Sequence, residues 1–122
     1  MTKVRSYTPD EVVQVVDKNS NLLLVHFGSP LASACEFIRQ ELEMLAPSFD
    51  ENILAFAEVE LPLQDFEVIQ AYNLEEIPTL ILFSGSVEVE RMEQILLPEE
   101  LKEFLETATS FYYGFVSGRE DL

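Results

Sequence analysis

Three continuous apolar runs constrain the fold of this chain more than any other feature of its sequence. They span residues 22–27, 53–57 and 79–83, and leucine, isoleucine, valine, alanine and phenylalanine dominate them. Each run has the length of a β-strand and is far too short to cross a bilayer. A strand that is apolar at successive positions, rather than at alternating ones, is typical of a sheet covered on both faces. The runs therefore predict strands in the middle of an α/β sheet.

Helical patterns separate these runs. Thr8, Pro9 and Glu11 supply a capping hydroxyl, a proline at the first helical position and a glutamate placed to close a capping box. Apolar side chains then recur at the spacing that buries one face of a helix. The predicted helices span about residues 9–18, 32–46, 63–72 and 98–109.

Turn and strand signals complete the predicted order of elements. Residues 84–86 predict a hairpin turn into an alternating strand at residues 87–90, and a short strand at residues 4–7 precedes the first helix. The order is therefore β-α-β-α-β-α-β-β-α. Helical connections imply parallel pairing, whereas the tight turn makes the last pair antiparallel. The sequence thus predicts a three-layer α/β/α sandwich with a mixed central β-sheet.

The chain is strongly acidic, which limits its partners. Its 122 residues include 23 Asp and Glu against 7 Lys and Arg, a formal net charge of −16. Such a surface repels phosphate backbones and anionic lipids, so we expect neither nucleic acid nor membrane as a partner. A protein partner with a basic or extended segment is the better candidate. The same charge also serves solubility alone, and both interpretations stay open.

The acidic positions near predicted loops and helix ends are the candidates for binding a cation. They are Glu58, Glu60, Asp65, Glu67, Glu75 and Glu76. They lack the alternating order of acids and the glycine of a calcium loop, so we expect a solvated acidic face and no bound metal or cofactor.

Cys35 is the single cysteine of the chain and therefore cannot form an intramolecular disulfide. Nothing in the sequence requires an oxidising compartment, and the first residues do not have the apolar stretch of a secretory signal. We expect a cytoplasmic protein.

The order and spacing of four segments resemble the thioredoxin family. Residues 24–27 resemble the central strand that leads into a thioredoxin active site, and Cys35 follows eight residues later at the start of a long helix. Forty-three residues beyond Cys35, Pro78 lies in a segment similar to the family's Ile-Pro-Thr. A hairpin with a glycine and a closing helix follow, so the resemblance covers about residues 4–109. It implies a thioredoxin-like fold.

The active-site loop departs from the family pattern. Where a thioredoxin carries tryptophan, cysteine, glycine, proline and cysteine, this chain has Leu31, Ala32, Ser33, Ala34 and Cys35. The resemblance thus places Ala32 at the attacking cysteine and keeps the resolving one as Cys35. Disulfide exchange needs an attacking thiolate and a second thiol that releases the mixed disulfide, and a single-thiol mechanism also needs the first cysteine. The resemblance implies a degenerate C-x-x-C motif and a redox-inactive protein.

His26 and Cys35 are the candidate catalytic residues, each with two open interpretations. By resemblance His26 stands where the family usually has a buried acid, while Gly28 and Gln94 replace a tryptophan and a glycine. His26 either pairs with Cys35 and lowers the pKa of the thiol, or is half-buried and hydrogen-bonded to backbone. Cys35 is either a thiolate favoured by the helix N-terminus or a small buried apolar side chain.

The resemblance also implies a partner-binding surface around Pro78. In relatives the peptide bond before this proline is cis, and the backbone beside it can pair with an extended segment of a partner. The candidate partner-binding residues are Glu75, Glu76, Ile77, Pro78 and Thr79. Alternatively, Pro78 serves the fold alone.

An aromatic segment follows the last predicted helix. Phe111, Tyr112, Tyr113 and Phe115 lie within five residues, and rings of this size bury on the order of 150–250 Å² each. They either cap the core or form a patch through which the chain self-associates. We expect a thioredoxin-like domain over residues 1–109 and an aromatic, then polar, tail over residues 110–122.

The leading functional hypothesis is a redox-inactive adaptor or chaperone that binds protein through the Pro78 groove and its acidic surface. A thiol redox protein or sensor that uses Cys35 alone is the first alternative. A self-associating structural subunit is the second.

Overall fold

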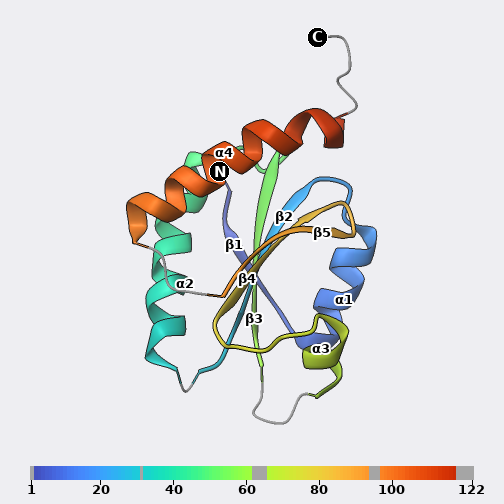
Figure 1. Ribbon diagram of the computed structural model, residues 1–122, viewed down its shortest axis with the longest axis vertical. Coiled ribbons are helices and arrows are strands. Elements are labelled where there is room, and N and C mark those ends of the chain that lie inside the picture. The colour runs from blue at the N-terminus through green and yellow to red at the C-terminus, as the bar shows by residue number, and fades with distance from the viewer. Residues whose placement is uncertain (1, 31, 62–65, 94–96, 118–122) are drawn as a thin grey trace.

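The computed structural model describes residues 2–30, 32–61, 66–93 and 97–117, and for residues 66, 67 and 113–117 it describes the backbone only. The strands are β1 (Val4–Tyr7), β2 (Leu22–Gly28), β3 (Leu54–Glu60), β4 (Thr79–Ser84) and β5 (Val87–Met92). The helices are α1 (Pro9–Lys18), α2 (Ser33–Leu45), α3 (Phe66–Ala71) and α4 (Pro98–Ser117), with a 3₁₀ turn, η1 (Ala46–Ser48), after α2. Figure 1 shows their arrangement, and the predicted order of elements is the observed one.

The five strands form one mixed sheet in the order β1-β3-β2-β4-β5. β1, β3 and β2 are parallel, whereas β4 is antiparallel to both β2 and β5. β2 lies at the centre, and its Leu24 pairs with Phe56 on one side and with Leu82 on the other. All seven residues of β2 are buried, as its continuous apolar pattern predicts.

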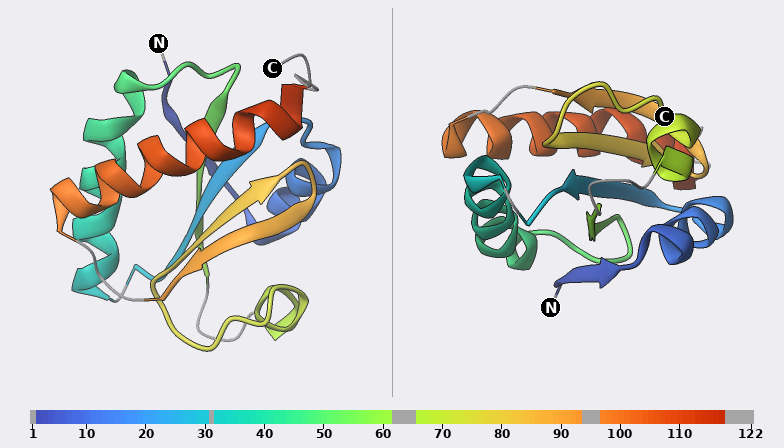
Figure 2. Two further views of the ribbon diagram at one scale, coloured as in Figure 1. Left: turned by 45° about the horizontal axis from the view of Figure 1, so that its top comes forward. Right: turned by 90° about the horizontal axis from the view of Figure 1, so that it is seen from below.

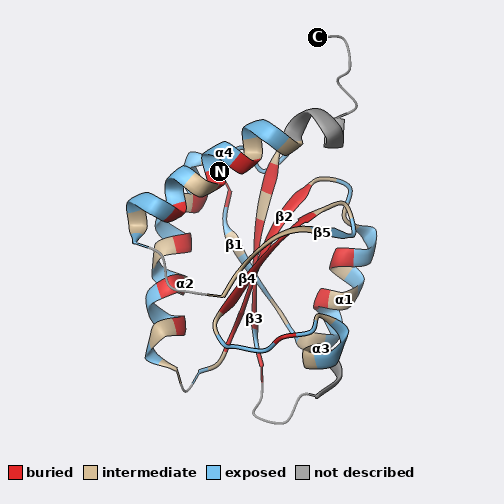
Figure 3. Cartoon of the chain, in the orientation of Figure 1, coloured by how far each residue is buried: buried red, intermediate tan, exposed pale blue. Residues whose placement is uncertain are grey.

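Side chains of the central strands alternate between two cores, one on each face of the sheet. Leu23 and Val25 belong to the core under α1 and α3, whereas Leu22 and Leu24 belong to the core under α2 and α4. The views of Figure 2 show the helices on both sides of the sheet. In Figure 3 the central strands are red along most of their length, and α1, α2 and α4 are red only in places. Burial on both faces therefore produces the three layers.

The α1 helix begins as its sequence predicts. The Thr8 hydroxyl accepts a hydrogen bond from the Glu11 amide at 3.1 Å, and the Glu11 carboxylate accepts one from the Thr8 amide at 2.9 Å. This reciprocal capping box satisfies two amides that the first helical turn leaves without partners.

The last helix is longer than predicted. α4 continues through Ser117, so residues 110–117 extend the helix and do not form a tail after it. The Gly and Pro signals that end a helix do not occur between residues 105 and 113, and the prediction placed the end too early. None of the helices among the described residues is long and apolar enough to span a membrane.

The third strand is also longer than the apolar run that predicted it. β3 reaches Glu60, and Glu58 lies inside the strand with only 7% of its surface exposed. The expectation that Glu58 belongs to a solvated acidic face is therefore wrong. Glu75 and Glu76 are exposed as expected, as is Glu60, whereas the side chains of Asp65 and Glu67 lie outside the described residues.

Arg91 links the edge strand β5 to the end of α3. Its guanidinium donates to the Tyr72 carbonyl at 2.5 Å and to the Asn73 carbonyl at 3.0 Å, while Glu88 holds it from the same strand at 2.7 Å. Asn73 has a φ of 51°, the left-handed conformation that asparagine tolerates. Arg91 thus satisfies carbonyls where the chain leaves the helix.

We predict that Arg91→Ala lowers the free energy of unfolding by about 1–2 kcal/mol, because two carbonyls lose a charged donor. Arg91→Lys should recover only part of this loss, since an ammonium lacks the planar fork. Chemical denaturation measures both. Arg5→Ala, which removes an exposed ion pair with Glu51, is the control and should leave the midpoint unchanged. An unchanged midpoint for Arg91→Ala would contradict this role.

Candidate functional site

The predicted site residues gather at one end of the sheet, where β2 ends and β4 begins. Phe27 of β2 pairs with Thr79 of β4, so the end of β2 lies beside the start of β4. The Leu61 amide donates to the Gly28 carbonyl at 2.8 Å, which fixes the end of β2 against the end of β3. Figure 1 shows the connection into α2 and the loop before β4 together at the lower edge of the sheet. The fold thus brings together the degenerate loop and the Pro78 loop.

Cys35 lies in the first turn of α2 and is buried, with 5% of its surface exposed. Its Sγ accepts a hydrogen bond from the Ser29 amide at 3.2 Å. Burial raises the pKa of the Cys35 thiol, and the charges of Glu58 and Glu60 add to this effect. The Ser29 hydrogen bond lowers the pKa, and its effect is smaller than that of burial. Near neutral pH the thiol is therefore protonated, which favours the buried interpretation of Cys35 over the reactive one.

The rest of the degenerate loop offers no second nucleophilic sulfur. Ala32 is the N-cap residue of α2 and makes no side-chain cap, because a methyl group has no acceptor. Ser33 is exposed and Ala34 is half-buried. Leu31 lies outside the described residues, as does Gln94, which follows β5.

His26 is fully buried, with 1% of its surface exposed, and is paired with a side chain. Its Nδ1 lies 3.2 Å from Oε1 of Glu58, the residue opposite it in the β2–β3 ladder. The interpretation of a half-buried histidine bound to backbone is therefore wrong on both counts. Sequence reasoning had no direct signal for the pair, because the predicted strand stopped at residue 57, one residue before Glu58.

The second nitrogen of His26 faces the space between β2 and α2. Nε2 is buried and has no hydrogen-bond partner among the described residues. His26 lines a cavity of about 30 Å³ together with Gly28, Cys35 and Glu58. A cavity of this size accommodates one water molecule.

The absence of a side chain at Gly28 provides space for His26 and Cys35. A Cβ at residue 28 would lie 3.1 Å from both Cε1 and Nε2 of His26, and 3.2 Å from Cβ of Cys35. The buried imidazole and the first turn of α2 thus fill the space that a side chain at this position would need. A side chain larger than glycine at residue 28 would therefore require His26 or the start of α2 to move.

The predicted partner-binding residues in the loop before β4 differ in their exposure. The Ile77–Pro78 peptide bond is cis. Glu75, Glu76 and Ile77 are exposed, whereas Thr79 is fully buried. The Thr79 hydroxyl donates to the Glu76 carbonyl at 2.5 Å, so this side chain shapes the loop and cannot contact a partner.

A shallow cavity of about 370 Å³ adjoins this loop. Glu75 and Glu76 line it from the loop, and Arg91, Met92 and Glu93 line it from β5 and the residue after it. Arg91 pairs with Glu88 at 2.7 Å and lies 4.0 Å from Glu93, so the carboxylates that line the cavity outnumber its one guanidinium. The described residues contain no group of three or more His, Cys, Asp or Glu side chains arranged to hold a metal ion.

The aromatic residues near the end of α4 divide between core and surface. Tyr112 packs against the core under α2 and α4, and its hydroxyl donates to Glu90 at 2.9 Å, which raises the pKa of Tyr112. Phe111 is 63% exposed. The side chains of Tyr113 and Phe115 lie outside the described residues. Tyr112 therefore caps the core, as the first interpretation has it, whereas self-association through this segment stays a prediction.

Comparison with known proteins identifies one family model and several proteins that this chain resembles. A family model described as Thioredoxin matches residues 3–107. Glutaredoxin-3 from Homo sapiens is 29% identical over 94 residues, which make up 76% of this chain and 27% of that protein. Glutaredoxin-3 from Bos taurus is 28% identical over 105 residues, 84% of this chain and 30% of that protein. The matched region spans less than a third of the length of these curated relatives.

A solved mutant thioredoxin from Halobacterium salinarum NRC-1 has the same fold. It superposes with a TM-score of 0.71 at 22% sequence identity, over 89% of this chain and 95% of that one. The predicted fold class is confirmed. The single Cys35 is consistent with a degenerate C-x-x-C motif.

We predict that Gly28→Ala lowers the free energy of unfolding by about 1–3 kcal/mol, because the added methyl group must displace the imidazole or the α2 helix. Gly28→Asn should lose more. The control is Gly85→Asn in the hairpin turn, where φ is +63° and the nearest atom would lie 3.8 Å from the Cβ. Asparagine tolerates this conformation, so thermal unfolding should be nearly unchanged. Equal losses at residues 28 and 85 would contradict the packing argument.

We predict that iodoacetamide alkylates Cys35 at least about 100-fold more slowly in the folded protein than in urea, because the thiol is buried and protonated. The rate should rise only above the ordinary thiol pKa of about 8.5. Mass spectrometry of quenched samples between about pH 5 and 9 measures it. A fast reaction whose midpoint lies well below the ordinary thiol pKa would contradict this account.

The raised pKa of Cys35 also predicts a pH dependence of stability. A group whose folded pKa is raised stabilises the fold fully below its unfolded pKa, and this contribution is lost as pH rises through the folded pKa. Denaturation midpoints should therefore fall above about pH 8.5 more steeply for the natural chain than for Cys35→Ala. Parallel curves for the two proteins would show that Cys35 keeps an ordinary pKa.

Proposed function

The chain belongs to the thioredoxin family, and we propose that it is a member that binds a protein partner and carries out no disulfide exchange. The contrast between the two loops of the site carries this proposal. Ala32 replaces the attacking cysteine and Cys35 is buried, while Ile77 in the adjacent loop remains exposed. The remaining thiol of the site is thus buried, while the adjacent loop stays accessible to a partner. We also propose a cytoplasmic location, since Cys35 needs no oxidising compartment.

The backbone of Ile77 supports binding by strand addition. Within the described part of the chain its amide and carbonyl make no hydrogen bond, and the β2–β4 ladder begins two residues later with Thr79. A backbone donor and acceptor two residues before a strand, in a residue that is exposed, can pair with an extended segment of another chain. The main chain would supply affinity, and neighbouring side chains would supply specificity.

The charge around Ile77 favours a basic segment. Glu75 and Glu76 precede it, and Glu93 adds a third carboxylate across the shallow cavity. Arg91 pairs with Glu88 and lies 4.0 Å from Glu93, so it offsets the charge of Glu93 more than that of Glu75 and Glu76. A lysine or arginine of an extended partner would therefore meet the exposed carboxylates of Glu75 and Glu76, in a chain with a net charge of −16.

We predict that a nine-residue peptide of alternating lysine and threonine binds this site. Its addition should move the NMR amide signals of Glu76, Ile77 and Thr79, because its backbone pairs beside them. Glu75→Lys with Glu76→Lys should weaken the complex about 5- to 30-fold, since two attractions become repulsions. Raising the salt concentration should weaken it further.

A charge-matched variant separates this site from general attraction to an acidic protein. Glu43→Lys with Glu106→Lys changes the net charge by the same amount at exposed positions on α2 and α4, and should leave the affinity within about twofold. Equal weakening by both double variants, or amide shifts confined to other surfaces, would defeat the proposal.

A further inference from the structure

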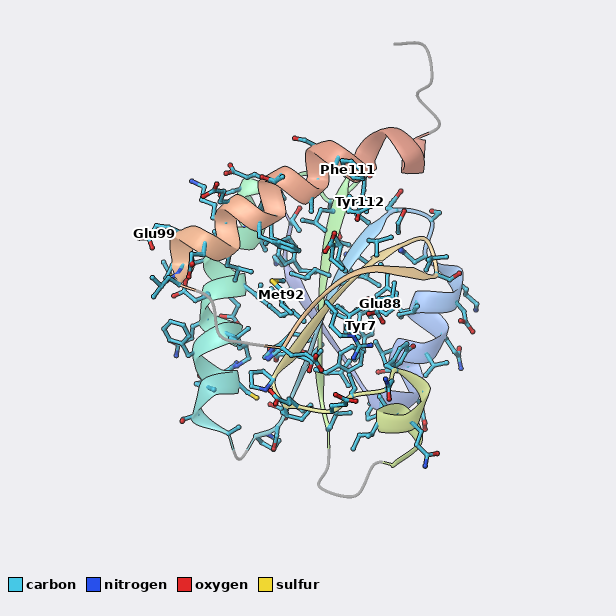
Figure 4. All side chains as sticks on the ribbon, in the orientation of Figure 1. Tyr7, Glu88, Met92, Glu99, Phe111 and Tyr112 are labelled. Atoms are coloured by element: carbon cyan, nitrogen blue, oxygen red, sulfur yellow. The ribbon has the colours of Figure 1, made fainter. Side chains whose placement is uncertain are left out.

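A second groove lies at the other end of the molecule, between α4 and β5. Its volume is about 580 Å³. Phe104, Phe111 and Tyr112 of α4 line it with aromatic surface, and Glu90, Glu100 and Glu103 surround them with carboxylates. Figure 4 shows Phe111 and Tyr112 near the C-terminal end of α4, far from Glu99 at its start. In Figure 1, α4 crosses the end of the sheet opposite the Pro78 loop.

The groove is held in shape by contacts across it. Tyr112 on α4 donates to Glu90 on β5, which ties the two walls together. The rings of Phe111 and Tyr112 meet edge to face, with centroids 4.8 Å apart. Phe104 is half-buried against the core beneath. The apolar part of the groove is thus built on fixed side chains, as a binding groove requires.

Phe111 gives the groove an exposed apolar ring. Although 63% of Phe111 is exposed, it neighbours the half-buried Tyr112 and Phe104 and so extends a continuous aromatic surface. Positions 104, 108 and 111 recur at helical spacing and form a ridge along α4. A ridge of this kind packs against the groove between the side chains of a second helix.

The charge of the rim decides the occupant. No lysine or arginine lines the groove among the described residues, whereas three glutamates do. A second copy of this chain would bring the carboxylates of two rims together and add its own charge of −16. A helix with an apolar face flanked by lysine or arginine would instead pair with these carboxylates while its apolar side chains cover Phe111.

We infer that the groove between α4 and β5 binds a basic amphipathic helix of another protein. Phe104, Phe111 and Tyr112 would contact its apolar face, and Glu90, Glu100 and Glu103 would pair with its basic side chains. This surface is separate from the Pro78 loop, and the chain would have two partner-binding sites at opposite ends of the sheet.

The experiment uses the full chain and a 14-residue amphipathic peptide with leucine on one helical face and lysine on the other. A scrambled peptide of the same composition keeps the charge but not the apolar face. The designed peptide should bind at least about 10-fold more tightly than the scrambled one, and should move amide signals of residues 104–112. Equal binding of both peptides, or shifts outside α4 and β5, would overturn the inference.

Matched variants identify the two parts of the groove. Phe111→Ser should weaken binding of the designed peptide about 10-fold, whereas Phe37→Ser, at another exposed phenylalanine, should not change it. Glu103→Lys should weaken binding about 3- to 10-fold, whereas Glu106→Lys, an exposed residue of the same helix outside the groove, should change it less than about twofold. A pair of variants with equal effects would overturn the part of the inference that it tests.

Two further measurements distinguish the basic helix from a second copy of the chain, and the α4–β5 groove from the Pro78 loop. Analytical ultracentrifugation of the chain alone should give a monomer, and a dimer dissociated by Phe111→Ser would show that a second copy occupies the groove and overturn the inference. Glu75→Lys with Glu76→Lys should leave binding of the amphipathic peptide unchanged. The inference and the proposed function of the Pro78 loop can therefore fail independently.

Discussion

Burial of β2 on both faces is the constraint on which the rest of this structure depends. The strand lies between β3 and β4, which satisfy its backbone, and its side chains alternate between two cores. Each core then needs helices to exclude water, and α1 with α3, and α2 with α4, provide them. The end of the strand at Gly28 fixes where α2 begins and where β4 starts. The position of the site thus follows from the packing of the sheet.

His26 is a polar residue within this buried strand, and its neighbours compensate for the free-energy cost of burying an imidazole. A buried imidazole needs a hydrogen-bond partner, and Glu58 supplies one from the adjacent strand. Gly28 supplies the space, because a larger residue would contact both the imidazole and Cys35. Cys35 is consequently enclosed, and its burial together with two nearby carboxylates raises the pKa of its thiol. The same packing that accommodates His26 therefore keeps the remaining sulfur protonated.

The exposed residues differ from the buried site residues in the kind of contact that they can make with a partner. Chemistry-bearing groups of the site are buried, whereas the Pro78 loop and α4 are among the places where exposed apolar residues and carboxylates occur together. Apolar area binds a partner without regard to charge, and carboxylates select a basic one and speed its approach. Both proposals therefore rest on the same physical argument, the attraction of carboxylates beside exposed apolar residues for a basic segment.

The sequence by itself determined the order of elements and the mixed sheet, because continuous apolar runs, a capping box and a hairpin turn are local signals. The resemblance of residues 31–35 to the thioredoxin active-site motif implied that Ala32 stands in place of the attacking cysteine. The tertiary structure alone decided the pairing of His26 with Glu58, since the two are 32 residues apart and meet only through strand register. It also decided that Thr79 is buried and that Tyr112 reaches Glu90 while Phe111 faces outward. These outcomes depend on which side of a packed element each residue occupies, and packing between distant segments sets that side.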